Sequence, residues 1–118
     1  DVQPGGELRA NIAQLFGRKT FDETAQQVMR EASPLFFLKA GMPPCLLVHG
    51  TADQSVPYQQ SVDWQEKSRK LGLVCDLITI KDGVHGMISW DSVAPTYKQD
   101  VVAWLNRTLK VAPAKMAR

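Results

Sequence analysis

An aspartate and a histidine each follow an apolar run that is typical of a buried strand. Asp53 lies four residues after His49, where the first run ends, and His85 lies five residues after Ile80, where the second ends. Because the carboxyl ends of parallel strands open on one edge of an α/β sheet, we expect the two side chains to meet there. A carboxylate can accept the Nδ1 hydrogen of an imidazole, fix its tautomer and stabilise the imidazolium that forms when a nucleophile is deprotonated. The two residues are therefore candidates for acid–base catalysis.

The two apolar runs predict two strands. Residues 45–49 are apolar without alternation and stand between two prolines and a glycine, which is typical of a strand buried on both faces. Residues 74–80 are rich in Leu, Ile and Val, and residues 81–83 turn the chain out of them. With a helix between the runs and another after them, the order predicts a right-handed crossover joining parallel neighbours, with helices covering the sheet.

Four helices are predicted around these strands. The first ends at Gly17, and the second begins at a capping box formed by Thr20 and Glu23 and must end before Pro34. The last is the most regular and accepts Pro95 in its first turn. The predicted helices cover residues 8–17, 20–32, 58–71 and 93–109.

Two strands are too few for a complete sheet. A parallel pair cannot bury both faces and both edges, so the first strand should have another partner that the chain does not encode. We therefore expect an α/β fold made of two parallel strands with flanking helices, with the remainder of the sheet missing from the chain.

Three segments resemble motifs of one enzyme family. The run Pro-Pro-Cys-Leu-Leu-Val-His-Gly-Thr-Ala-Asp over residues 43–53, followed by Val56-Pro57, resembles the acid-bearing turn of α/β-hydrolases, especially their esterase/lipase and prolyl-oligopeptidase-like branches. Gly-Val-His-Gly at residues 83–86 resembles their histidine loop, and Ala-Ser-Pro-Leu at residues 32–35 resembles the segment leading into the acid strand. The order of the motifs and the 32 residues from Asp53 to His85 make the combination specific. The resemblance extends over roughly residues 6–110.

This resemblance implies that the chain is the C-terminal part of an α/β-hydrolase fold. Residues 1–118 would form a single partial domain, in which residues 1–34 are cap-side helices and residues 35–118 the final strand–helix–strand–helix unit. The two strands would be the last two of an eight-stranded sheet. The missing N-terminal half of the fold, or an oligomer, is expected to cover the exposed strand edge.

The resemblance also implies a function. Asp53 would be the acid and His85 the base of a catalytic triad whose order along the chain is Ser, Asp, His. No Gly-x-Ser-x-Gly nucleophile elbow and no HGGG-type oxyanion loop occurs here, so we expect no nucleophile in this chain and no activity from the chain alone. The complete protein would hydrolyse a small-molecule carboxylic ester through an acyl-enzyme, with neither a metal nor an organic cofactor.

Two other functions stay open. A prolyl-oligopeptidase-like serine peptidase shares this C-terminal pattern. The alternative from a different class is a chain without catalytic function. It would be either a truncated fragment or an interaction module that reuses the half-fold.

The singled-out residues also have structural explanations. Asp53 could simply cap the helix that follows, and His85 could be a turn residue beside Gly86. We expect His49, at a strand end before a glycine, to pack rather than to bind a metal or take part in catalysis. Pocket lining and core filling are equally open for three residues after the histidine, Met87, Ile88 and Trp90.

The composition excludes several classes of protein. A formal charge of +2 without clustered Lys and Arg argues against nucleic-acid binding, and no apolar stretch is long enough to span a bilayer. Cys45 and Cys75 begin neighbouring strands, and we favour buried free thiols over a disulfide. The histidines lack a metal-ligand spacing. We expect a soluble protein; no signal peptide is visible at the start, and the compartment stays open between cytoplasmic and secreted.

Overall fold

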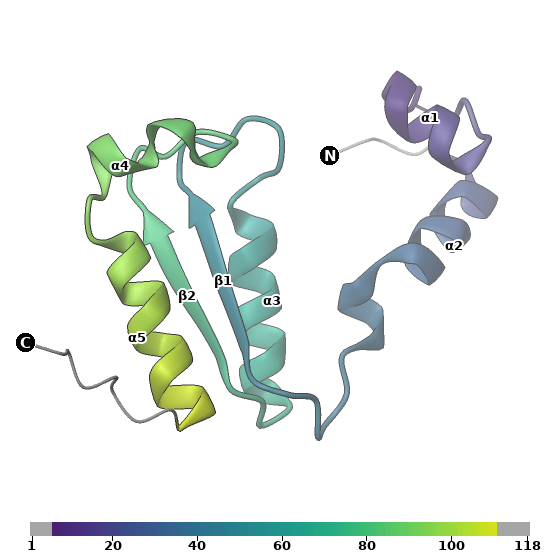
Figure 1. Ribbon diagram of the computed structural model, residues 1–118. Coiled ribbons are helices and arrows are strands. Elements are labelled where there is room, and N and C mark those ends of the chain that lie inside the picture. Colours follow the sequence, from purple (N-terminus) through teal and green to yellow (C-terminus); the bar gives the residue numbers. More distant parts are fainter. Residues whose placement is uncertain (1–5, 111–118) are drawn as a thin grey trace, which may run out of the picture. The chain divides into compact units, whose positions relative to one another are not determined.

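The structure is a computed structural model that describes residues 6–110. The chain divides into two compact units, of which the first ends at Leu38 and the second begins at Lys39 (Figure 1). Each unit is described separately below. Among the described residues, none of the helices has the length and apolar character that crossing a bilayer requires.

The first unit contains short helices. Helix α1 spans Ala10–Phe16 and ends at Gly17, whose φ of 63° is the left-handed cap that a glycine adopts readily. Helix α2 spans Glu23–Ala32, and a 3₁₀ turn, η1, follows at Pro34–Phe37. The predicted helix ends at Gly17 and before Pro34 are thus confirmed.

The N-cap of α2 corrects the predicted capping box. Asp22, not Thr20, is the cap residue, and its carboxylate accepts a hydrogen bond from the backbone N–H of Ala25 at 2.7 Å. Thr20 instead forms an isolated antiparallel bridge with Glu7, which holds its backbone extended outside the helix. The helix therefore begins at Glu23, two residues later than a cap at Thr20 would place it.

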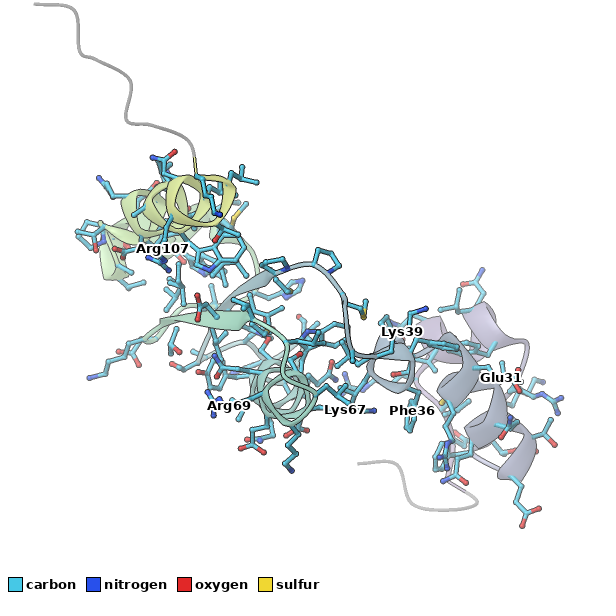
Figure 2. All side chains as sticks on the ribbon, turned by 90° about the horizontal axis from the view of Figure 1, so that it is seen from below. Glu31, Phe36, Lys39, Lys67, Arg69 and Arg107 are labelled. Carbon is cyan, nitrogen blue, oxygen red and sulfur yellow. The ribbon has the colours of Figure 1, made fainter. Side chains whose placement is uncertain are left out.

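The second unit is a parallel two-stranded sheet between helices. Strands β1 (Cys45–Gly50) and β2 (Cys75–Ile80) pair in parallel, and His49 stands opposite Thr79. The helices α3 (Gln59–Lys70) and α5 (Tyr97–Leu109) cover opposite faces, as the positions of Arg69 and Arg107 on either side of the sheet show (Figure 2). The predicted α/β class, with two parallel strands and flanking helices, is confirmed.

The predicted last helix is two helices. A short 3₁₀ turn, η2 (Met87–Ser89), leads into α4 (Trp90–Val93), and α5 begins only at Tyr97. Ala94 lies outside the helical region, with φ −147° and ψ 70°. The ring of Pro95 disfavours the α conformation at the residue before it, which explains why the continuous apolar spacing does not form one helix.

The core of the second unit lies under the carboxyl end of β2. Ile80, Trp90 and Tyr97 are buried, and Val48, Ile78 and Ala94 pack against them. Trp90 and Tyr97 meet edge to face, with ring centroids 5.6 Å apart. The sequence predicts that β1 is buried on both faces, but only its last residue, Gly50, is buried. The other residues are half-buried because β2 is the one strand that pairs with β1 among the described residues.

Candidate active site

Gly50 and Gly83 allow close contact between the loops that follow strands β1 and β2. A Cβ on Gly50 would overlap the carbonyl oxygen of Gly83, and a Cβ on Gly83 would lie 2.7 Å from Cγ2 of Ile80. The backbone N–H of Ala52 donates to the carbonyl oxygen of Gly83 at 2.9 Å. Only residues without a side chain permit this approach, so the glycines bring the loop of Asp53 against the loop that carries the histidine.

The histidine loop is also anchored to the core. Asp82 has a φ of 59°, a conformation that Asp tolerates better than most residues, and its N–H donates to Oγ1 of Thr51 at 2.9 Å. On the other side of the loop, Nε1 of Trp90 donates to the carbonyl oxygen of Val84 at 2.9 Å. The side chain of Trp90 is core filling. The loop is therefore held at both ends of the segment that presents His85.

The carboxylate of Asp53 is held by its own turn. Its Oδ1 accepts the backbone N–H groups of Ser55 and Val56, each at 2.9 Å, and the side chain is only 5% exposed. Helix α3 begins later, after Tyr58, so this carboxylate caps a turn before the helix and not the helix itself. The predicted capping role thus applies only to the turn.

The second oxygen of Asp53 faces the histidine. Oδ2 lies 2.9 Å from Nδ1 of His85, so the structure brings together the two residues that the sequence predicts to be a pair. The hydrogen bond from Val56 is the largest cause that lowers the pKa of Asp53 well below its usual range; burial opposes it, and the bond from His85 adds to it. An ionised Asp53 accepts the hydrogen on Nδ1 of His85, which leaves the Nε2 lone pair available on an imidazole that is 58% exposed.

A second imidazole contacts the same carboxylate. Nε2 of His49 lies 3.2 Å from Oδ2 of Asp53 and 3.1 Å from the carbonyl oxygen of Val56, and its Nδ1 lies 2.6 Å from Oγ of Ser61. The sequence predicts a packing role for His49 and does not predict these bonds. The one hint in the sequence is the spacing of four residues from Asp53, and in an irregular turn this spacing does not specify a contact.

A hollow opens beside the histidine. It has a volume of about 340 Å³, and Gln54, Ser55, Val84 and His85 are among its lining residues. Met87 and Ile88, for which pocket lining stayed open, are exposed in the described part of the chain and do not line it. The hollow gives a small molecule access to the imidazole.

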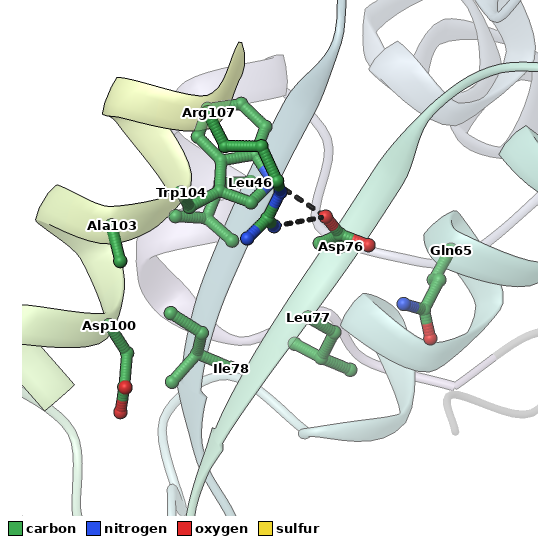
Figure 3. Close-up of a pocket in the computed structure, with 9 residues that line it drawn as sticks. All are labelled: Leu46, Gln65, Asp76, Leu77, Ile78, Asp100, Ala103, Trp104 and Arg107. Atoms are coloured by element: carbon green, nitrogen blue, oxygen red, sulfur yellow. Dashed lines mark hydrogen bonds and ion pairs between the residues drawn. The ribbon is translucent and has the colours of Figure 1, made fainter. Parts of the chain in front are cut away.

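Another hollow lies at the opposite end of the strands and is not part of this site. It is lined by Asp76 near the start of β2 and by Trp104 and Arg107 of α5 (Figure 3). Nε1 of Trp104 donates to Oδ2 of Asp76 at 2.7 Å, and the guanidinium of Arg107 lies 3.5 Å from the same oxygen. These bonds fasten α5 to β2.

Cys45 and Cys75 are both free thiols, as expected, and are half-buried at paired positions of the two strands. Burial and the neighbouring Cys45 raise the pKa of Cys75. Within residues 6–110, no group of three or more His, Cys, Asp or Glu side chains is placed to hold a metal ion.

Solved structures of esterases resemble this chain. A thermophilic esterase of the planctomycete Thermogutta terrifontis, Est2, matches 80% of this chain with a TM-score of 0.64 and 24% identity, which shows a shared fold. The same organism's esterase 2, phosphorylated by paraoxon, matches 71% of the chain with a TM-score of 0.62 and 28% identity. A truncated carbohydrate esterase from gut microbiota matches 84% with a TM-score of 0.69 and 28% identity.

The chain spans only 38%, 34% and 33% of the lengths of these three proteins. None of the curated proteins matches it. The BD-FAE family model matches residues 3–68, which is more than half of the 118 residues and includes β1 and Asp53. The two-stranded unit is thus the C-terminal portion of an α/β-hydrolase fold, and the chain belongs to the BD-FAE family.

Proposed function

We propose that this chain is the C-terminal segment of a serine hydrolase that cleaves carboxylic esters of small molecules. In this proposal Asp53 is the acid of the triad and His85 is the base. The nucleophilic serine belongs to a part of the protein outside this chain. The complete enzyme uses neither a metal nor an organic cofactor.

One observation carries the proposal, the 2.9 Å hydrogen bond between Asp53 and Nδ1 of His85. It supports the tautomer that a general base needs, because the bond occupies Nδ1 and leaves Nε2 to receive a proton. Nε2 has no hydrogen-bond partner among residues 6–110, and the ring is exposed beside a hollow. A nucleophile supplied from elsewhere can therefore approach this atom.

The proposed reaction follows from these positions. The serine oxygen attacks the ester carbonyl while Nε2 of His85 takes its proton, and the tetrahedral intermediate collapses to an acyl-enzyme as that proton passes to the leaving alcohol. Water then attacks the acyl group with His85 again as base, and the serine is released with its proton restored. Asp53 stays ionised throughout and stabilises the imidazolium.

The relatives support this class of substrate. The compared structures are described as esterases, one of which is phosphorylated by paraoxon and another of which is a carbohydrate esterase. Paraoxon is therefore a suitable probe for the proposed nucleophile. A peptidase of the prolyl-oligopeptidase kind is the alternative, and hydrolysis of peptide substrates in preference to esters would favour it.

A second serine–histidine–aspartate hydrogen-bond network lies within the described residues. Ser61 contacts Nδ1 of His49, whose Nε2 contacts Asp53. We do not assign catalysis to it, because His49 is only 12% exposed, and Ser61 lies in the first turn of helix α3, where the backbone N–H groups of residues 60–62 already donate to carbonyl oxygens and are not free to bind an oxyanion. The experiment below distinguishes the two serines.

The experiment titrates the full-length protein with paraoxon and measures the burst of p-nitrophenolate. We expect about one equivalent for the parent protein and for Ser61→Ala, and no burst for His85→Ala, because the serine is then not activated. An unchanged burst in His85→Ala would remove this residue from the site. Loss of the burst in Ser61→Ala, with the fold intact by circular dichroism, would indicate that the nucleophile is Ser61, within this chain.

We further propose that the rest of the same protein covers the free edge of β1. The side chains from Cys45 to His49 are only half-buried, and among the described residues β2 is the only strand that pairs with β1. An unpaired, apolar, parallel strand is a position that proteins normally cover. Hydrogen exchange on the full-length protein tests this: the amides of residues 46–48 should be as protected as those of β2, and rapid exchange there would contradict it.

A further inference from the structure

The imidazole of His49 is fixed on both of its nitrogens. Nε2 faces two oxygens, Oδ2 of Asp53 at 3.2 Å and the carbonyl oxygen of Val56 at 3.1 Å, while Nδ1 lies 2.6 Å from Oγ of Ser61. The ring also meets Tyr58 edge to face, with centroids 5.7 Å apart. The side chain is 12% exposed, so solvent has little access to either nitrogen.

These contacts decide which nitrogen carries the hydrogen. A carboxylate and a carbonyl oxygen only accept hydrogen bonds, so Nε2 of His49 must be the donor to both. In the neutral ring Nδ1 is then an acceptor, and the hydroxyl of Ser61 donates to it. Ser61 therefore favours the tautomer that presents an N–H group to Asp53.

The donor from His49 completes the hydrogen bonding of the carboxylate. Oδ1 of Asp53 accepts two backbone N–H groups, and Oδ2 accepts one hydrogen from each imidazole, at 2.9 Å from His85 and 3.2 Å from His49. A carboxylate held by four donors cannot rotate without breaking bonds, and the Asp53 side chain is only 5% exposed, so water cannot readily replace them. Its Oδ2 is thereby fixed in the direction of His85.

We propose that His49 is a positioning residue, which acts through Asp53 on the orientation of His85. This inference rests on the proposed function, in which His85 is the base. When His85 gains a proton on Nε2 during the reaction, the donor from His49 lowers the basicity of Oδ2 and so keeps the hydrogen of Nδ1 on the imidazolium. Ser61 acts one step further away by fixing the tautomer of His49.

Two variants of the full-length protein test the positioning role. Both His49→Met and His49→Gln remove the ring, but only Gln can place an N–H donor near the position of Nε2. We expect kcat for a p-nitrophenyl ester to fall by about 10- to 100-fold in the Met variant, with KM nearly unchanged, because a misplaced catalytic group has an effect of this size. The Gln variant should recover most of the loss. Equal activity of the two variants, or parent-like kcat in the Met variant, would overturn the inference.

His85→Ala separates this inference from the proposed function. If that variant keeps its activity, the proposed function fails whatever the His49 variants do. If it is inactive while His49→Met equals the parent, only the positioning role fails. Both outcomes are read in the same ester assay.

Nuclear magnetic resonance of the unchanged full-length protein gives a second readout, which does not depend on enzyme kinetics. With ¹⁵N-labelled histidine, the spectrum should show a proton on Nε2 of His49 at the pH of the assay, assigned by the signals that disappear in His49→Gln. A ring with its only proton on Nδ1 would overturn the inference, because it could not donate to Asp53.

Discussion

Replacing Asp53 by Asn tests the orientation of the proposed catalytic pair, Asp53 and His85, with little change in shape. In the native turn, Oδ1 accepts backbone N–H groups of Ser55 and Val56, both at 2.9 Å. An amide must place its carbonyl oxygen at that position, because its NH₂ group cannot accept. The NH₂ group then takes the place of Oδ2, which lies 2.9 Å from Nδ1 of His85.

The tautomer of His85 then reverses. An NH₂ group donates, so Nδ1 of His85 must become the acceptor and the hydrogen of the neutral ring moves to Nε2. In the proposed mechanism, Nε2 of His85 has to be free of hydrogen to deprotonate the serine. The loss of general-base catalysis and of imidazolium stabilisation predicts that kcat/KM falls by about 10²- to 10⁴-fold.

The assay is steady-state hydrolysis of a p-nitrophenyl acyl ester by the full-length protein, with thermal unfolding to confirm the fold. Asp82→Asn is the matched control, because it makes the same change of charge in the neighbouring loop and Asn tolerates its φ of 59°. We expect the control to keep parent-like activity. If a folded Asp53→Asn protein retains more than half of the parent kcat/KM, the reasoning from the tautomer is wrong.

Three further predictions concern the support of the site. Gly50→Ala should lower the melting temperature and reduce kcat/KM by about tenfold or more, because its Cβ overlaps the carbonyl of Gly83 and drives the loops apart; parent-like values of both would contradict this. Trp90→Phe leaves the carbonyl of Val84 without its donor and should cost about 1–3 kcal/mol of unfolding free energy in urea titrations; a loss well below this range would show that the bond does not hold the loop. Folding lowers the pKa of Asp53, so its contribution to stability is present above about pH 4 and lost as the pH falls below it. In Asp53→Asn, the free energy of unfolding should therefore fall less between neutral and acidic pH than in the parent. The same dependence of unfolding free energy on pH in both proteins would contradict this.

The acid–base pair could be predicted from the sequence because its geometry follows from topology. Once the apolar runs before Asp53 and His85 are assigned to parallel neighbouring strands, their carboxyl ends must share one edge of the sheet. The strands themselves could be recognised, since each run is too short for a typical helix, is rich in Leu, Ile or Val, and is closely followed by a glycine.

Features that depend on competition between local contacts were not predictable in the same way. Thr20 and Asp22 are both favoured N-cap residues, and only the bridge from Glu7 to Thr20 decides in favour of Asp22. The apolar spacing of the last helices continues through the region of Pro95, so periodicity alone hides the interruption at Ala94.

His49 was missed for a different reason. Its type and place at a strand end are compatible with packing, and its role depends on how tightly the turn after Gly50 folds back. In the structure, the N–H of Asp53 donates to the carbonyl oxygen of Gly50 at 3.3 Å, and this turn brings the carboxylate of Asp53 beside the imidazole of His49. A distance of four residues in an irregular turn does not specify such a contact in advance, whereas it would in a helix.

The contacts that assemble the acid–base pair all lie within one segment of the chain. The glycine contact, the turn around Asp53 and the anchor from Trp90 to Val84 involve residues between Gly50 and Trp90. None of them uses the free edge of β1, where we propose that the rest of the protein pairs. The orientation of His85 is therefore independent of pairing at that edge. With the proposed serine in the rest of the protein, variants that weaken pairing at β1 should lower activity by displacing the serine, while leaving the Asp53–His85 hydrogen bond in place.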